Sequence, residues 1–227
     1  TGSGNVAVGK DVLLANTTGT SNTGVGYLAL TATTTGAYNV AVGAAALDAN
    51  VGGDFNTALG TSALGANTSA DNNTALGYSA LTANTTGTAN VAVGKSAGAA
   101  LTTGSYNTAI GIDTLLVATT ADSNTAVGRE ALKANTSGSS NTALGRDTLQ
   151  ANTTGSDNVA VGHNALDSNT TASNNIAIGA AAMNANTTGA SNVAVGTYAL
   201  DANTTAANNV AVGYGSLGTN TTGASNV

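Results

Sequence analysis

The chain has 227 residues, with no cysteine, no proline and a formal net charge of −6. Disulfide bonds are therefore excluded, and the acidic balance offers no basic patch for nucleic acid and no attraction to anionic membrane surfaces. Only 7% of the residues are charged, which is low for a globular domain, and no apolar run is long enough to cross a membrane.

One unit of seventeen residues repeats along the whole chain, with asparagine at its first position and glycine at its fifth. A fixed period this short indicates stacked copies of one small unit, and we expect an all-β parallel β-solenoid with one turn per repeat. The asparagines are Asn5, Asn22, Asn39, Asn56, Asn73, Asn90, Asn107, Asn124, Asn141, Asn158, Asn175, Asn192 and Asn209. The glycines are Gly9, Gly26, Gly43, Gly60, Gly77, Gly94, Gly111, Gly128, Gly145, Gly162, Gly179, Gly196 and Gly213.

Residues 1–227 are expected to form a single array of thirteen full repeats that begins at Asn5. Four residues precede the first repeat and two follow the last, so both ends fall in mid-pattern. Complete solenoids normally end in atypical repeats that cover the open core. The sequence therefore favours an excerpt of a longer fibre.

The first five positions of each repeat, N-[VT]-A-[VLI]-G, alternate as a β-strand does. Position four is always Val, Leu or Ile, as in Val8, Leu59 and Val212, and we expect this column to point inward. The alanines at position three would then face outward. Strands that are apolar on both faces are usually covered on both, which favours a neighbouring chain on the outer side. A weakly apolar face exposed to solvent is the alternative.

The two invariant residues have separate structural interpretations. Asparagine suits a ladder of stacked side-chain amides at a corner, because it tolerates left-handed backbone and bonds nearby backbone groups. Glycine marks either a turn with positive φ or a point where no Cβ fits between chains.

The second segment, A-L-x-A-N-T-T, predicts another strand. Leucine at position nine, alanine at eleven and threonine at thirteen would share its inward face. A looser asparagine column occupies position twelve in ten of the thirteen repeats, from Asn16 to Asn220. Repeats 90–106, with Gly98 and Leu101, and 107–123 are the least regular, and we expect the core leucine to shift there. Charges fall only at positions six, seven, ten, sixteen and seventeen, as solvent-facing corners require.

No catalytic, cofactor-binding or metal-ligating set emerges. His163 is the only histidine and is interpreted as a surface residue. Asp54 and Asp71 share a column and are weak candidates for bridging a calcium ion. Tyr27, Tyr78, Tyr198 and Tyr214 are candidates for stacking on sugars, although scattered surface tyrosines are the favoured interpretation. The N-x-[ST] sequons arise automatically in a repeat that contains N-T-T, so a ladder or turn is favoured over glycosylation.

The repeat resembles the head repeats of YadA-like trimeric autotransporter adhesins and the arrays of phage-type tail-fibre proteins. The likeness is carried by N-T-A-L-G-Y-S-A-L-T-A-N-T-T-G at 73–87 and by N-V-A-V-G at 158–162, and it covers the whole chain. It implies a left-handed β-roll and a homotrimeric rod, with the alanine and glycine columns near the interface. The adhesin repeat is shorter, so the turn should differ.

We therefore expect a structural or adhesive fibre segment, an adhesin head or tail-fibre shaft, that presents or carries a receptor-binding surface. It would be extracellular, on a cell surface or virion, and would pair with itself as a homotrimer or filament and with a host-surface glycan or protein. Nucleic acid, membrane insertion, cofactors and enzymatic activity are not expected. One alternative is an ice-binding β-solenoid, using threonines at positions thirteen and fourteen, although adjacent strand residues face opposite ways. Another is a self-assembling single-chain extracellular filament.

Overall fold

The computed structural model describes residues 2–227, so Thr1, the first residue of the predicted array, lies outside the described residues. The chain divides into two compact units, one ending at Asp113 and the other spanning Thr114–Val227. Every regular element in the described residues is a β-strand of three residues. The chain is an all-β parallel β-solenoid with one strand per seventeen-residue turn, which confirms the predicted fold.

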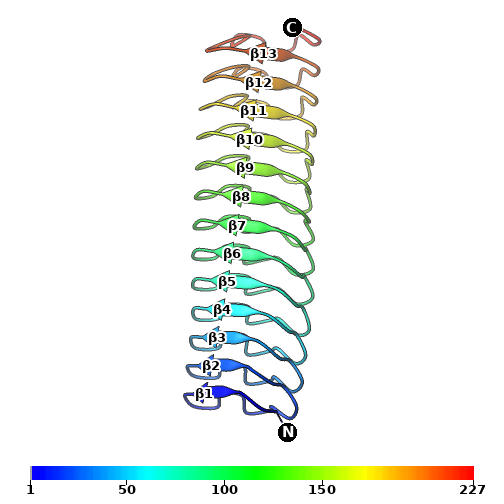
Figure 1. Ribbon diagram of the computed structural model, residues 1–227. Helices are drawn as coiled ribbons and strands as arrows, with labels where there is room; N and C mark the ends of the chain where they lie inside the picture. The colour runs from blue at the N-terminus through cyan, green and yellow to red at the C-terminus, as the bar shows by residue number, and fades with distance from the viewer. Residues whose placement is uncertain (1) are drawn as a thin grey trace. The chain divides into compact units, whose positions relative to one another are not determined.

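The first unit holds seven strands that stack in chain order, each parallel to the next (Figure 1). Equivalent repeat positions lie opposite one another, so Ala41 pairs with Ala58 and Val42 with Leu59. The strands are β1 (Val6–Val8), β2 (Thr23–Val25), β3 (Val40–Val42), β4 (Thr57–Leu59), β5 (Thr74–Leu76), β6 (Val91–Val93) and β7 (Thr108–Ile110).

The second unit repeats the arrangement with six strands in the same register, for example Ala160 opposite Ala177. Its strands are β8 (Thr125–Val127), β9 (Thr142–Leu144), β10 (Val159–Val161), β11 (Ile176–Ile178), β12 (Val193–Val195) and β13 (Val210–Val212). β-Branched residues at position two and at most fourth positions favour the extended backbone. The glycine at position five then ends each strand.

The inward column of the strand is alanine, not the larger aliphatic residue, so our assignment of the two strand faces was wrong. Ala58, Ala75 and Ala143 are fully buried, whereas the position-four residues Leu59 and Leu144 lie on the outside. The interior is filled from the opposite side by the position-nine leucine, as in Leu64, and by the asparagine columns. Only the methyl group of an alanine fits between these side chains and the strand.

One exception shows how little room the interior offers. Gly24 replaces the inward alanine, and a Cβ built there would lie 2.5 Å from Val12 Cγ1. Val12 occupies position eight, where most other repeats have alanine. The two substitutions compensate, because one adds the volume that the other removes.

The second segment is a series of turns, so the predicted second strand is wrong. Positions seven and nine have positive φ, for example 55° at Asp147 and 52° at Leu149, which an extended strand does not allow. Its backbone still bonds the next turn of the coil, as when the Leu30 N–H donates to the Ala46 carbonyl. Leucine nine points inward as expected, but alanine eleven is half-buried and threonine thirteen is half-buried or exposed, so those two assignments were wrong.

The two irregular repeats behave differently. In repeat 90–106, Leu101 is buried at position twelve, and its Cδ1 lies 3.1 Å from where a Gly98 Cβ would stand. The core leucine has therefore moved by three positions. In repeat 107–123, Leu115 occupies the regular buried position, so no shift occurs there.

Candidate interaction surface

The outer side of the strands is an uncharged strip with one continuous aliphatic column in each unit, which we call the strand face. It consists of position four, aliphatic throughout, and position two, which carries Val, Ile or Thr. Leu76 in the first unit exposes 41% of its surface and Leu144 in the second exposes 48%. The strand face thus displays side chains that would normally be buried.

The strand face is also free of charge, because positions one to five hold no charged residue in any repeat. A strip three residues wide and six or seven strands high covers on the order of 300 Å² in each unit. Patches of this size are the largest that typical monomers expose and are often functional. Depletion of charge is characteristic of the centre of a protein interface.

The position-one asparagines are buried and form a ladder along each unit. The side-chain Oδ1 of one asparagine accepts the backbone N–H of the next, at 3.0 Å from Asn39 to Asn22 and 2.9 Å from Asn192 to Asn175. Their side-chain Nδ2 donates to the carbonyl at position fifteen of the same repeat, as from Asn39 to Gly53 at 2.8 Å. These residues hold the coil together and are not available to a ligand.

The position-twelve asparagines form a second buried ladder that shares this carbonyl. Asn50 Nδ2 donates to the Gly53 carbonyl at 3.0 Å, beside the bond from Asn39. Asn67 Nδ2 donates in turn to Asn50 Oδ1 at 2.9 Å. Most sequon asparagines lie in this ladder and are buried, whereas Asn72, at position seventeen, is exposed.

The position-five glycines meet the first of the two conditions that we considered, a positive φ. Their φ values lie between 124° and 142°. A Cβ at Gly77 would stand 2.4 Å from the Gly94 carbonyl oxygen. The neighbour that excludes the side chain is the next turn of the same chain, not another chain.

The threonine turn lies on the surface of the coil. Thr136 Oγ1, at position thirteen, donates to the Thr153 carbonyl at 3.0 Å, and Thr153 Oγ1 donates to the Thr170 carbonyl at 2.9 Å. Thr154 and Thr171, at position fourteen, are exposed as well. Position fourteen is exposed and position thirteen is exposed or half-buried, so the two columns do not point to opposite faces as in a strand; the segment is a turn.

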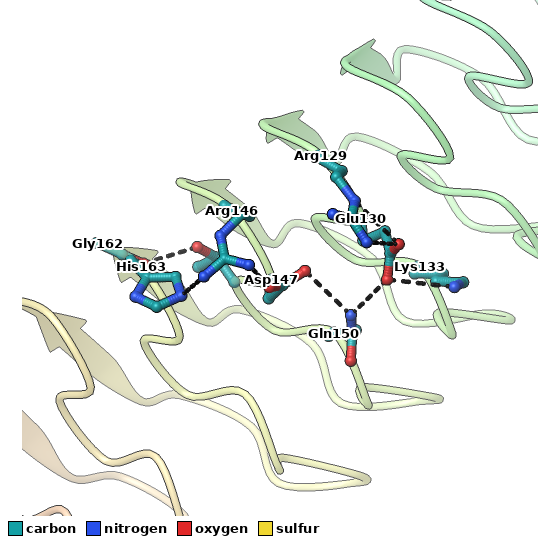
Figure 2. Close-up of polar contacts among 9 residues, drawn as sticks. Arg129, Glu130, Lys133, Arg146, Asp147, Gln150, Gly162 and His163 are labelled. Carbon is teal, nitrogen blue, oxygen red and sulfur yellow. Dashed lines mark hydrogen bonds and ion pairs between the residues drawn. The ribbon is translucent and has the colours of Figure 1, made fainter.

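A polar network occupies one corner of the second unit, at positions six, seven and ten (Figure 2). Glu130 accepts hydrogen bonds from Arg129 at 2.7 Å, from Lys133 at 3.2 Å and from Gln150 at 2.8 Å. Gln150 also donates to Asp147 Oδ1 at 3.2 Å. The network links successive turns of the coil through their side chains.

The network continues to the next turn, where Arg146 Nη1 lies 3.1 Å from Asp147 Oδ2 and Arg146 Nη2 contacts His163 Nε2. Hydrogen bonds from Arg129 and Lys133 lower the pKa of Glu130. Burial, reinforced by the charge of Asp147, raises the pKa of Asp167 in the adjoining repeat. His163, interpreted from the sequence as a surface residue, is exposed and belongs to this corner.

The remaining candidates have simple structural roles. Asp71 Oδ1 accepts the Asp54 N–H at 2.7 Å, which ties one turn to the next. Among residues 2–227, no group of three or more His, Cys, Asp or Glu side chains is placed to hold a metal ion. We detect no pocket in that range, and no helix with the length and apolarity to span a bilayer. Tyr27, Tyr78, Tyr198 and Tyr214 are exposed.

Sequence reasoning missed the contacts between aromatic side chains, which include an edge-to-face pair of Tyr198 and Tyr214. Tyr38 and Phe55, at position seventeen of successive repeats, are exposed and stack with ring centroids 5.1 Å apart. Two aromatic residues at the same position of neighbouring repeats would have revealed the pair. It also missed the corner network, whose signal is the clustering of charge in three consecutive repeats.

Comparison with protein-family models, with curated proteins and with solved structures finds no match. The resemblance to adhesin and tail-fibre repeats therefore stays an expectation based on the repeat motif.

Proposed function

We propose that the chain is a segment of an extracellular structural or adhesive fibre, in which copies of the chain pack through the strand face into a multi-chain rod, most simply a homotrimer. The observation that carries the proposal is the uncharged aliphatic strip along the strands of each unit. Packing would remove that strip from water, and burying each Val or Leu contributes roughly 1.5–3 kcal/mol at full burial.

The geometry of the repeat supports the same proposal. Every repeat presents the same two columns at the same height, so a second copy in register meets an identical surface along its whole length. Homo-oligomers commonly use such repeated contacts in closed symmetric assemblies. A rod built this way would suit an adhesin head or a tail-fibre shaft on a cell surface or virion.

Sedimentation equilibrium of the chain, with Leu76→Lys/Leu144→Lys as the test variant, examines the proposal. We expect the native chain to have the mass of several copies and the variant, whose charges lie on the strand face, to be monomeric with an unchanged circular dichroism spectrum. Tyr78→Lys/Tyr198→Lys adds the same charge at exposed side chains outside the strands and should leave the association unchanged. A native chain that stays monomeric at high concentration contradicts the proposal.

Ice binding is the second candidate, favoured by the exposed threonine columns at positions thirteen and fourteen. Hydrogen bonds such as that of Thr136 to the Thr153 carbonyl hold the position-thirteen side chains in regular rows. A regular row of hydroxyl and methyl groups is what a lattice-matching surface requires. If the chain does not affect the recrystallisation of ice, this candidate is ruled out. For the alternative of a filament of single chains, electron microscopy gives the mass per unit length, which distinguishes one chain per cross-section from several.

A further inference from the structure

The basic residues of this acidic chain are concentrated at one corner of the second unit. Three of its five lysines and arginines and its only histidine lie within residues 129–163. Arg129, Arg146 and His163 occupy position six of three consecutive repeats, and Lys133 shares the Glu130 carboxylate with Arg129 (Figure 2). The column therefore repeats a basic group at each of these three turns, about 4.8 Å apart.

Acidic and basic side chains at this corner differ in depth. The carboxylates of Glu130 and Asp147 are 14% and 16% exposed, whereas the guanidinium side chains of Arg129 and Arg146 are 59% and 53% exposed. The carboxylates lie beneath and hold the guanidinium groups at 2.7 and 3.1 Å. The corner consequently presents cationic groups to solvent although the chain as a whole is negative.

This arrangement is suited to a ligand with repeated negative charges. A guanidinium group offers a planar set of donors that matches carboxylate and sulfate oxygens. Anchoring of the arginines by Glu130 and Asp147 lowers the entropy cost of binding a ligand. Acidic residues in distant repeats have little effect, because exposed charges are screened over about 8 Å at physiological ionic strength.

We propose that the corner formed by Arg129, Lys133, Arg146 and His163 binds an acidic polysaccharide that runs along the stacking direction, with successive carboxylate or sulfate groups meeting successive turns. The inference goes beyond the proposed function and does not depend on packing between chains. Nucleic acid fits less well, because these three repeats place no tyrosine, phenylalanine or tryptophan at position six on which a base could stack.

The experiment measures the affinity of the whole chain for dextran sulfate and for polygalacturonate, with uncharged dextran and duplex DNA as reference ligands. Arg129→Gln/Arg146→Gln is expected to weaken binding to both acidic glycans about tenfold, because each exposed guanidinium group that pairs with an anion raises the affinity by about threefold. The two acidic glycans separate sulfate from carboxylate recognition, and binding to either supports the proposal.

Lys10→Gln/Lys95→Gln is the matched control, because it removes two positive charges from position six in other repeats. We expect this control to change the affinity by less than about twofold. Equal decreases in both double variants, unchanged affinity in the arginine variant, or tighter binding to duplex DNA than to the acidic glycans would overturn the proposal.

Glu130 keeps Lys133 and Gln150 as donors in the arginine variant, so the coil should remain folded, which circular dichroism checks. If the double variant does not fold, single Arg146→Gln replaces it, with an expected decrease in affinity of about threefold, again set against single Lys95→Gln. Sedimentation of the same variants should be unchanged, so failure of glycan binding and failure of chain packing are distinguishable.

Discussion

The position-twelve ladder runs unbroken from Asn135 to Asn220 in the second unit, whereas it is interrupted twice inside the first. From Asn152 onward each side-chain Nδ2 donates to the Oδ1 of the preceding turn, at distances such as 2.8 Å from Asn152 to Asn135. In the first unit Thr33 and Leu101 interrupt the column, and in the second unit Ala118 precedes the unbroken run. The interruptions leave Asn16 Oδ1, Thr33 Oγ1 and Asn84 Oδ1 buried without a partner.

The two breaks inside the first unit differ in how the neighbouring residues compensate for them. Leu101 replaces an amide by an apolar side chain that fills the space left empty by Gly98, so the volume of the core is conserved. The Oδ1 of Asn84 nevertheless has no hydrogen-bond donor. Thr33 has no such compensation. A buried acceptor without a partner costs about 1–3 kcal/mol, so each break should weaken the coil locally.

The largest effect is expected from moving the Leu101 substitution into the intact ladder. Asn152→Leu would orphan Asn135 Oδ1 and crowd Leu149, which already fills the core of that turn. We expect local stability to fall by about 3 kcal/mol. Hydrogen exchange of the amides in the surrounding turns measures the decrease. Leu149→Gly/Asn152→Leu recreates the pairing of Gly98 with Leu101, and no recovery of stability relative to the single variant would contradict our account of that pair.

A double-mutant cycle at Gly98 and Leu101 tests the same pair in its own repeat, by restoring the regular leucine and asparagine. Leu101→Asn alone opens a void, and Gly98→Leu alone clashes with Leu101 and Leu81, so each single change should destabilise the turn. Together they restore the regular repeat and the bond to Asn84. We expect a coupling free energy of about 2–3 kcal/mol from urea unfolding. Additive effects would show that the two residues are independent.

Thr33→Asn should stabilise the first unit, because the side chain can donate to Asn16 Oδ1 and accept from Asn50 Nδ2. Threonine and asparagine are similar in size, and the site is fully buried. We expect a gain of about 1–2 kcal/mol, measured by hydrogen exchange in residues 16–50. Thr34→Asn changes an adjacent residue on the surface and serves as the control. A gain of the same size in the control would rule out the ladder as its cause.

The smallest effect concerns Asp167, whose Oδ1 is also buried without a partner. Burial raises the pKa of Asp167 in the folded chain. The loss of stability caused by its ionised carboxylate is therefore absent below the ordinary aspartate pKa and grows as the pH rises through the folded pKa. Asp167→Asn should therefore stabilise the chain at neutral pH, with a gain that disappears in acid.

Glu130→Gln provides the opposite case. The pKa of Glu130 is lowered in the folded chain. The stability that its carboxylate contributes is therefore present above the ordinary glutamate pKa and is lost as the pH falls through the folded pKa. Thermal unfolding of both variants between pH 3 and pH 8 (roughly the range in which carboxyl groups titrate) compares them. A pH dependence of the same sign in the two variants would contradict these assignments.

Much of the fold is predictable from the sequence, because a strict period leaves few ways to stack seventeen residues. The inward leucine of position nine and the strands after each asparagine follow from periodicity alone. The corner network and the aromatic pair of Tyr38 and Phe55 were missed because they depend on neighbours one turn apart, which the pattern of a single repeat does not reveal.

The sequence by itself determined the repeat length, the parallel stacking and the absence of charge from the strands. Only the tertiary structure decided which strand face is inside, because hydrophobicity ranks Leu59 above Ala58 whereas the space left by Leu64 and the asparagine ladders admits only the methyl group. The larger aliphatic side chains are displaced to the surface for that reason. The strand face exists because the interior of the coil has too little space for these side chains. The proposal of a multi-chain fibre rests on that face.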